Sequence, residues 1–141
     1  MAFPTKILLA TDGSEDAALA TKAAIDLSNQ SGAELHVVHV GRSSLRLSPT
    51  EYHAAAREKI GELAKAVEEA GGDVTEAHLR IDDSQTAGNE AEHITGLAEE
   101  LGADLIVIGS RGLSGMKRLV MGSVSESVVR HAHCPGLVMR H

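Results

Sequence analysis

The chain has 141 residues, the length of one ordinary domain, so a second full domain is excluded. Hydrophobic residues make up 43% and charged residues 23%, which is enough apolar material to bury a core. The net charge of -7 is the wrong sign for a protein that binds nucleic acid through phosphates, and with only two aromatics, Phe3 and Tyr52, base-stacking platforms are excluded as well. We therefore expect one globular domain over residues 1–141, with no nucleic-acid partner.

We expect neither a membrane segment nor a secretory signal in this sequence. No apolar run approaches the roughly 18 to 20 residues of a membrane helix, and the opening MAFPTK lacks the charged lead and apolar stretch of a signal peptide. Cys134 is the only cysteine, which excludes an internal disulfide and agrees with a reducing compartment. We expect a cytoplasmic protein that has no membrane partner.

Short β-rich segments alternate with helical patterns along the chain, and this alternation predicts a parallel α/β fold. Residues 6–11 (KILLAT) and 104–109 (DLIVIG) are nearly continuous apolar runs, which is typical of central strands covered on both faces. Residues 34–40, 74–81 and 136–140 are less uniformly apolar or shorter, and we expect them to be flanking or edge strands.

Helical periodicity fills the intervals between these strands. Apolar residues share one helical face in three segments, and a short fourth helix is expected near the end: 20–27, 56–67, 94–101 and 124–132. Residues typical of helix boundaries are also present: Ser48 and Pro49 at a start, and Gly32, Gly71 and Gly102 past ends. With right-handed crossovers, these elements predict an open parallel five-stranded sheet in strand order 3-2-1-4-5, with helices on both faces.

In that strand order the winding direction reverses between the first and fourth strands, and open sheets bind ligands at the carboxyl ends of such strands. The two loops expected there, residues 10–14 and the loop that begins at Gly109, are the richest in glycine and serine. The second loop reads GSRGLSGMKRLVMGSVSES. Its glycines let backbone N–H groups approach an anion, and the helix start at Ser123 adds free N–H groups and the positive end of the helix dipole.

The same loop concentrates positive charge, at Arg111, Lys117 and Arg118, in an otherwise acidic chain. Turn-forming glycines beside a solvated basic face are the alternative interpretation, but four glycines together with a serine-rich helix start favour an anion site. The chain lacks the Gly-Lys-Ser/Thr of a Walker A motif and the Gly-x-Gly-x-x-Gly fingerprint after its first strand. A P-loop NTPase and a Rossmann dehydrogenase are therefore excluded, and any purine would be held by aliphatic side chains.

The spacing Gly109-x2-Gly112-x9-Gly122-Ser123 resembles the ATP-binding signature of the universal stress protein family. The segments KILLATDGSEDAALA, ADLIVIGSRG and HCPGLVM are also similar to that family, so the resemblance covers essentially the whole chain. It implies a Rossmann-like fold of the adenine nucleotide alpha hydrolase kind and a nucleotide-responsive module, usually a homodimer, in stress or metabolic signalling. It further implies ATP as the ligand, with Mg²⁺ or Mn²⁺ held through the phosphates and no protein side chain as a metal ligand.

The resemblance also implies which residues contact the nucleotide. Asp12 matches the acidic residue near the ribose and adenine, and Val40 matches the position whose backbone contacts the adenine edge. The remaining matches flank Asp12 or open and close the phosphate loop: Ala10, Thr11, Gly109, Arg111, Gly112, Gly122, Ser123, Val124 and Ser125. We expect Gly122 to lie in a turn that needs glycine torsions.

Signals for metal-site chemistry are weaker. His36 and His39 are three residues apart on one strand, so we expect them on opposite faces of the sheet, and the cluster at residues 131–134 has no carboxylate at ligand spacing. Neither pattern predicts a metal site.

The phosphate loop offers no positioned base for water, so we expect nucleotide binding without efficient turnover. A slow ATPase, a self-phosphorylating protein and a nucleotide-independent dimeric scaffold are the alternatives. We expect the homodimer to form through the C-terminal strand at residues 136–139, where Gly136 lowers the β-propensity of the contact.

Overall fold

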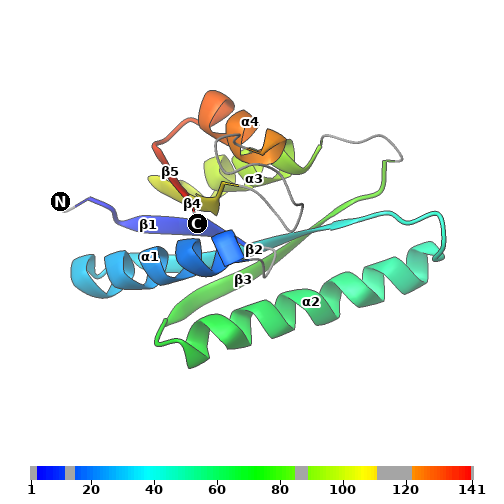
Figure 1. Cartoon of the computed structure of the whole chain (residues 1–141), viewed down its shortest axis with the longest axis horizontal. Coiled ribbons are helices and arrows are strands. Elements are labelled where there is room, and N and C mark those ends of the chain that lie inside the picture. Colours follow the sequence, from blue (N-terminus) through cyan, green and yellow to red (C-terminus); the bar gives the residue numbers. More distant parts are fainter. Residues whose placement is uncertain (1–2, 12–14, 85–88, 111–121, 141) are drawn as a thin grey trace.

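The computed structural model describes residues 3–11, 15–84, 89–110 and 122–140. Strands and helices alternate strictly along the chain (Figure 1): β1 (Lys6–Ala10), α1 (Glu15–Ser31), β2 (Glu34–Arg42), α2 (Pro49–Glu69), β3 (Val74–Asp82), α3 (Glu90–Leu101), β4 (Leu105–Gly109), α4 (Ser123–His131) and β5 (Gly136–Met139). The bounds of the strands and of α4 differ from the predicted ones by at most two residues.

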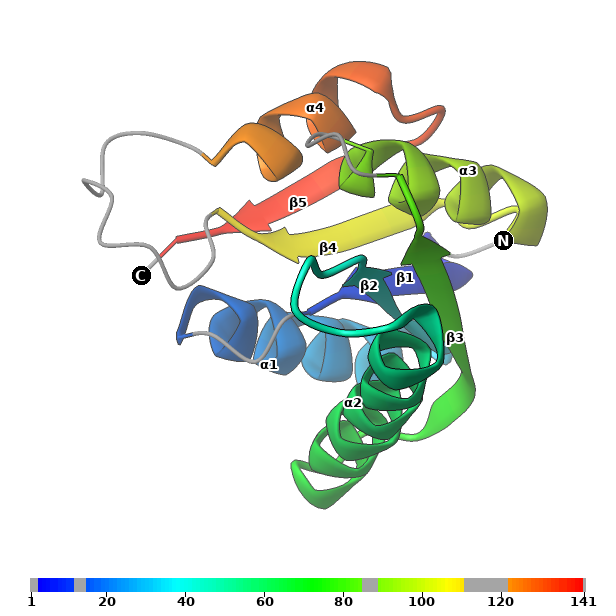
Figure 2. The same ribbon diagram turned by 90° about the vertical axis from the view of Figure 1, so that its right-hand side faces the viewer.

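The five strands form one parallel sheet in the order β3-β2-β1-β4-β5. The predicted fold class and strand order are therefore confirmed. β1 is the central strand and pairs with β2 on one side and β4 on the other. Figure 2 shows α1 and α2 on one face of the sheet and α3 and α4 on the other.

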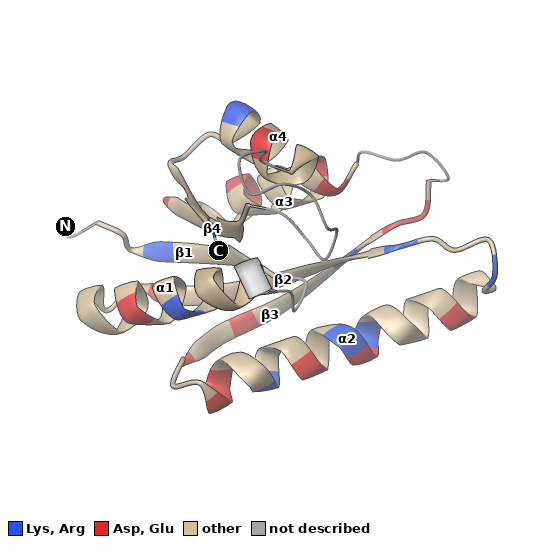
Figure 3. Ribbon diagram, viewed as in Figure 1, with Lys and Arg blue, Asp and Glu red and all other residues tan. Residues whose placement is uncertain are grey.

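The sheet separates two apolar layers, and residues along β1 alternate between them. Ile7 and Leu9 pack with α1 and α2, whereas Leu8 and Ala10 pack with α3 and α4. Because each face is covered, β1 and β4 are apolar at consecutive positions, as the sequence predicted. Basic and acidic residues alternate along α2 (Figure 3).

The predicted helix boundaries are present. The Ser48 hydroxyl accepts the Glu51 N–H at 3.2 Å, and the Glu51 carboxylate accepts the Ser48 N–H at 2.9 Å, which forms a capping box with Pro49 in the first turn of α2. Three glycines adopt positive φ past helix ends: Gly32, Gly71 and Gly102. None of the described helices has both the length and the apolar character needed to cross a membrane.

Asp104, just before β4, fastens the start of β1. Its carboxylate accepts hydrogen bonds from the backbone N–H groups of Thr5 and Lys6 at 2.9 to 3.0 Å, and one from the Thr5 hydroxyl at 3.0 Å. A similar contact ties α2 to the end of β3, where the buried Tyr52 donates its hydroxyl proton to Asp83 at 2.7 Å.

A β-bulge interrupts the pairing of β2 with β3. Leu35 pairs with Val74, but His36 pairs with Glu76, so Thr75 is the extra residue. The Thr75 hydroxyl accepts the Leu35 N–H at 3.1 Å. As a result Val74 packs against the α1 and α2 layer, while Glu76 lies beside His36 on the opposite face.

Candidate functional site

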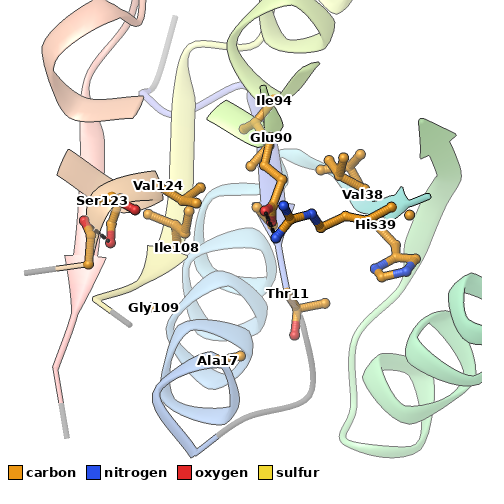
Figure 4. Close-up of a pocket in the computed structure, with 16 residues that line it drawn as sticks. Thr11, Ala17, Val38, His39, Glu90, Ile94, Ile108, Gly109, Ser123 and Val124 are labelled. Atoms are coloured by element: carbon orange, nitrogen blue, oxygen red, sulfur yellow. Dashed lines mark hydrogen bonds and ion pairs between the residues drawn. The ribbon is translucent and has the colours of Figure 1, made fainter. Parts of the chain in front are cut away.

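A cavity of about 480 Å³ opens at the carboxyl ends of β1, β2 and β4 (Figure 4). The first turns of α3 and α4 and the early part of α1 complete its walls. The cavity thus occupies the point where the winding direction of the sheet reverses, which is where the sequence placed the ligand site.

One part of the cavity is aliphatic. Val38 and Val40 of β2, Ile94 of α3 and Ile108 of β4 all line it, together with Ala17 of α1. Figure 4 shows the Ile94 and Val38 side chains among the residues that line the cavity. These apolar walls suit a flat, hydrophobic group such as a purine, which is consistent with the expectation that aliphatic side chains would hold it.

The other part of the cavity is the start of α4. Gly122 is the N-cap residue, and its own N–H donates to the Ser110 carbonyl at 2.6 Å. Because glycine has no side chain, no side-chain cap closes this helix start. The N–H groups of Ser123, Val124 and Ser125 have no acceptor within the helix, and they lie at the positive end of its dipole. This is the arrangement that binds anions at helix starts.

The expectation for Gly122 is wrong in one respect. Its φ of -65° and ψ of 154° are extended values that any residue adopts, so the backbone here does not need glycine torsions. The residue is nevertheless buried at the cavity wall, and its lack of a side chain is what leaves the helix start open.

Ser125 has a structural contact that the sequence did not reveal. Its buried hydroxyl donates to the Ser110 carbonyl at 2.5 Å, tying the first turn of α4 to the end of β4. The hydroxyl proton is therefore used inside the protein, whereas the exposed hydroxyl of Ser123 lines the cavity. A phosphate contact by the Ser125 side chain stays a prediction.

The rim of the cavity contains an ion pair that the sequence analysis missed. Arg42 at the end of β2 and Glu90 at the start of α3 lie 3.1 Å apart, and His39 lines the same region. Their positions in the sequence could have identified these residues. All three lie near the carboxyl end of β2 or the start of the helix that follows β3. Charged residues at such positions lie beside a switch-point crevice in an open sheet.

The structure brings eight of the predicted residues to this one cavity: Ala10, Thr11, Val40, Gly109, Gly122, Ser123, Val124 and Ser125. The other three lie outside the described residues: Asp12, Arg111 and Gly112. The cavity lining establishes where the eight residues lie, and their contacts with a nucleotide remain predictions.

A model of the universal stress protein family matches residues 4–140. The chain belongs to this family. The universal stress protein YxiE of Bacillus subtilis is 34% identical to it over 145 aligned positions, which cover 96% of this chain and 98% of that protein. The universal stress protein MJ0531 of Methanocaldococcus jannaschii is 32% identical and is covered to 81%.

Solved structures agree with this assignment. A universal stress protein from Archaeoglobus fulgidus superposes with a TM-score of 0.76 at 26% identity, covering 96% of this chain and 98% of that one. A second structure from the same organism, described as a complex with dAMP, has a TM-score of 0.72 at 24% identity and covers 99% of this chain and 100% of that one. At that identity the dAMP complex shows the shared fold.

Proposed function

We propose that this protein binds ATP together with a divalent cation and acts as a nucleotide-responsive module rather than as an enzyme of rapid turnover. The observation that carries the proposal is the joining of two features in one cavity: aliphatic walls from β2, α3 and β4, and an uncapped helix start at Gly122. The walls suit the purine and the helix start suits a phosphate group.

The size of the cavity supports a nucleotide. Small-molecule sites commonly enclose about 300 to 1,000 Å³, and this cavity encloses about 480 Å³ among the described residues. The glycine-rich segment between β4 and α4 supplies the further argument for a triphosphate, because its sequence carries the family's ATP-binding spacing. The dAMP bound by the Archaeoglobus relative is an adenine nucleotide as well.

Titration calorimetry with ATP, AMP and adenosine in the presence of Mg²⁺ tests the proposal. We expect Gly122→Val to weaken ATP at least tenfold, because a branched side chain would occupy the buried start of α4. Adenosine has no phosphate, so the same variant should lower the affinity for adenosine much less. Ser123→Ala should weaken ATP by about 1 to 3 kcal/mol through loss of one charge-assisted hydroxyl contact.

Two controls sharpen this measurement. Gly96→Val, in α3, places the same side chain where an added Cβ meets nothing within 4 Å, so ATP affinity should not change. If Asp12 contacts the nucleoside, Asp12→Ala should lower the affinities for ATP and adenosine by the same factor. Wild-type protein that binds none of the three ligands, or a Gly122→Val variant with unchanged ATP affinity, would overturn the proposal.

A further inference from the structure

Two histidines and two glutamates gather on the α3 side of β2 and β3, toward the amino ends of these strands. The Nδ1 atom of His36 lies 2.9 Å from Nε2 of His78, and that same Nε2 lies 3.7 Å from a carboxylate oxygen of Glu76. One ligand atom from each of these three residues lies within 4.8 Å of the other two. None of the three lines the cavity described above.

The β-bulge at Thr75 makes this cluster possible. Regular pairing onward from Leu35 and Val74 would place Thr75 opposite His36 and turn Glu76 and His78 toward α2. With the extra residue, Glu76 pairs with His36 and His78 pairs with Val38, so both face the α3 side. Bulges are known to redirect side chains in this way next to functional sites.

Glu34 fixes the orientation of the His36 ring. Its carboxylate oxygen lies 2.9 Å from Nε2 of His36 and therefore accepts the proton on that nitrogen. The remaining nitrogen, Nδ1, then presents its lone pair to His78. A carboxylate that accepts the outer N–H of a histidine is the usual second partner of metal-binding imidazoles.

Two ring nitrogens at 2.9 Å need a proton or a metal ion between them. Without a metal, a proton on Nε2 of His78 makes this contact, and a bound metal ion would take the place of that proton. The cluster also contains two carboxylates, Glu34 and Glu76, whose negative charge favours a bound cation. Of the cations near the cluster, Arg80 is paired with Glu100 of α3 at 2.8 Å, and the Lys6 ammonium donates to the Leu101 carbonyl at 2.8 Å.

We propose that His36, His78 and Glu76 bind a divalent transition-metal ion of the zinc class, with Glu34 as the residue that positions His36. Ligands at about 2.1 Å in tetrahedral geometry lie roughly 3.4 Å from one another, and the observed separations of 2.9 and 3.7 Å fall on either side of that value. The mixed nitrogen and oxygen donors select zinc-like ions over Mg²⁺, which prefers oxygen alone.

The exposure of Glu76 would let the ion enter from solvent and take a water molecule as its fourth ligand. The His36 and His78 side chains are 5% and 10% exposed, whereas Glu76 is 63% exposed. Zinc can therefore enter from the Glu76 side and complete its coordination with water. Because β3 is an edge strand, the bound ion would fasten it to β2 and stabilise the folded chain.

Calorimetric titration of the nucleotide-free protein with Zn²⁺, in buffer containing Mg²⁺, tests the proposal. We expect one Zn²⁺ ion per chain and a higher melting temperature in its presence. His78→Gln and Glu76→Gln should each lower the affinity for Zn²⁺ more than 100-fold. Glu34→Gln should lower the Zn²⁺ affinity about 10- to 100-fold, as is typical for a partner that only orients a ligand.

Matched controls separate this site from zinc bound elsewhere on the surface. Glu62→Gln removes an exposed carboxylate from α2, and His133→Gln removes an exposed imidazole near Cys134. Neither should change Zn²⁺ affinity. Glu76→Gln alters an exposed side chain, so it keeps the test decisive if His78→Gln fails to fold. The absence of saturable binding, full binding by Glu76→Gln, or loss of binding in His133→Gln would each overturn the proposal.

Discussion

At the scale of single residues, the partly exposed carboxylate of Asp104 contributes to the stability of this fold. Burial alone would raise its pKa, but hydrogen bonds from Lys6 and Thr5 outweigh that effect and hold the pKa below its usual value of 3.8. A carboxylate of this kind stabilises the folded state above its ordinary pKa, and the contribution is lost as the pH falls through the lowered value.

Asp104→Asn should therefore lower the free energy of unfolding by about 2 kcal/mol at pH 7, since the bonds lost are made to a charged group. The difference from wild type should shrink as the pH falls from the ordinary pKa of 3.8 through the lowered pKa of the folded state, because the wild-type carboxyl then becomes protonated as well. Urea unfolding at pH 7 and pH 3 measures both values. Asp73→Asn, an exposed carboxylate past α2, is the control, and an equal deficit at both pH values would contradict the argument.

At this scale the sequence was informative where chemistry depends on residue type and spacing. Within the part of the chain that the structure describes, four residues of the phosphate motif line the cavity, as does Val40: Gly109, Gly122, Ser123 and Ser125. The sequence was uninformative where a role depends on a distant partner. Nothing near Ser125 indicates that its hydroxyl is used by Ser110, and nothing near His36 indicates that His78 lies 2.9 Å away.

At the scale of a single element, the capping box at the start of α2 is the clearest stabilising feature. Ser48→Ala removes the acceptor for the Glu51 N–H, so the variant should be less stable by about 1 kcal/mol. Thermal unfolding followed by circular dichroism should show a drop in melting temperature of a few degrees. Ser48→Asp keeps an oxygen at the cap and should restore most of the loss. Identical melting of Ser48→Ala and wild type would show that this cap adds no stability.

Most of the elements could be predicted because their signals are local. Apolar runs, helical periodicity and glycines past helix ends each depend on a few neighbouring residues, and α2 and β4 follow directly from them. The bulge in β3 could not be predicted in this way. Strict alternation assigns Val74, Glu76 and His78 to one face, and only the pairing with β2 shows that Val74 faces the other.

At the scale of the whole molecule, β5 is an edge strand of four residues with apolar side chains that are only half buried. We expect two chains to associate through it, because pairing of such edges satisfies their free backbone groups. Light scattering should give twice the 14.8 kDa chain mass. Val138→Lys should shift the protein toward monomers while circular dichroism confirms that it stays folded.

The opposite edge of the sheet provides the control for this experiment. Ala77→Lys places the same charge at an exposed position of β3 and should leave the mass unchanged. Wild-type protein that is monomeric at micromolar concentration would contradict the expectation. Equal dissociation of both variants would show that the interface does not depend on β5.

Tyr52 has a practical consequence for work with this protein. The chain has one tyrosine and no tryptophan, so the intrinsic fluorescence above that of phenylalanine comes from a single ring. That ring is buried between α2 and the end of β3, and its hydroxyl is bonded to Asp83. Emission therefore reports the α2–β3 contact alone, whereas circular dichroism averages over all the helices. Unfolding curves from the two signals will coincide only where the domain unfolds as one cooperative unit.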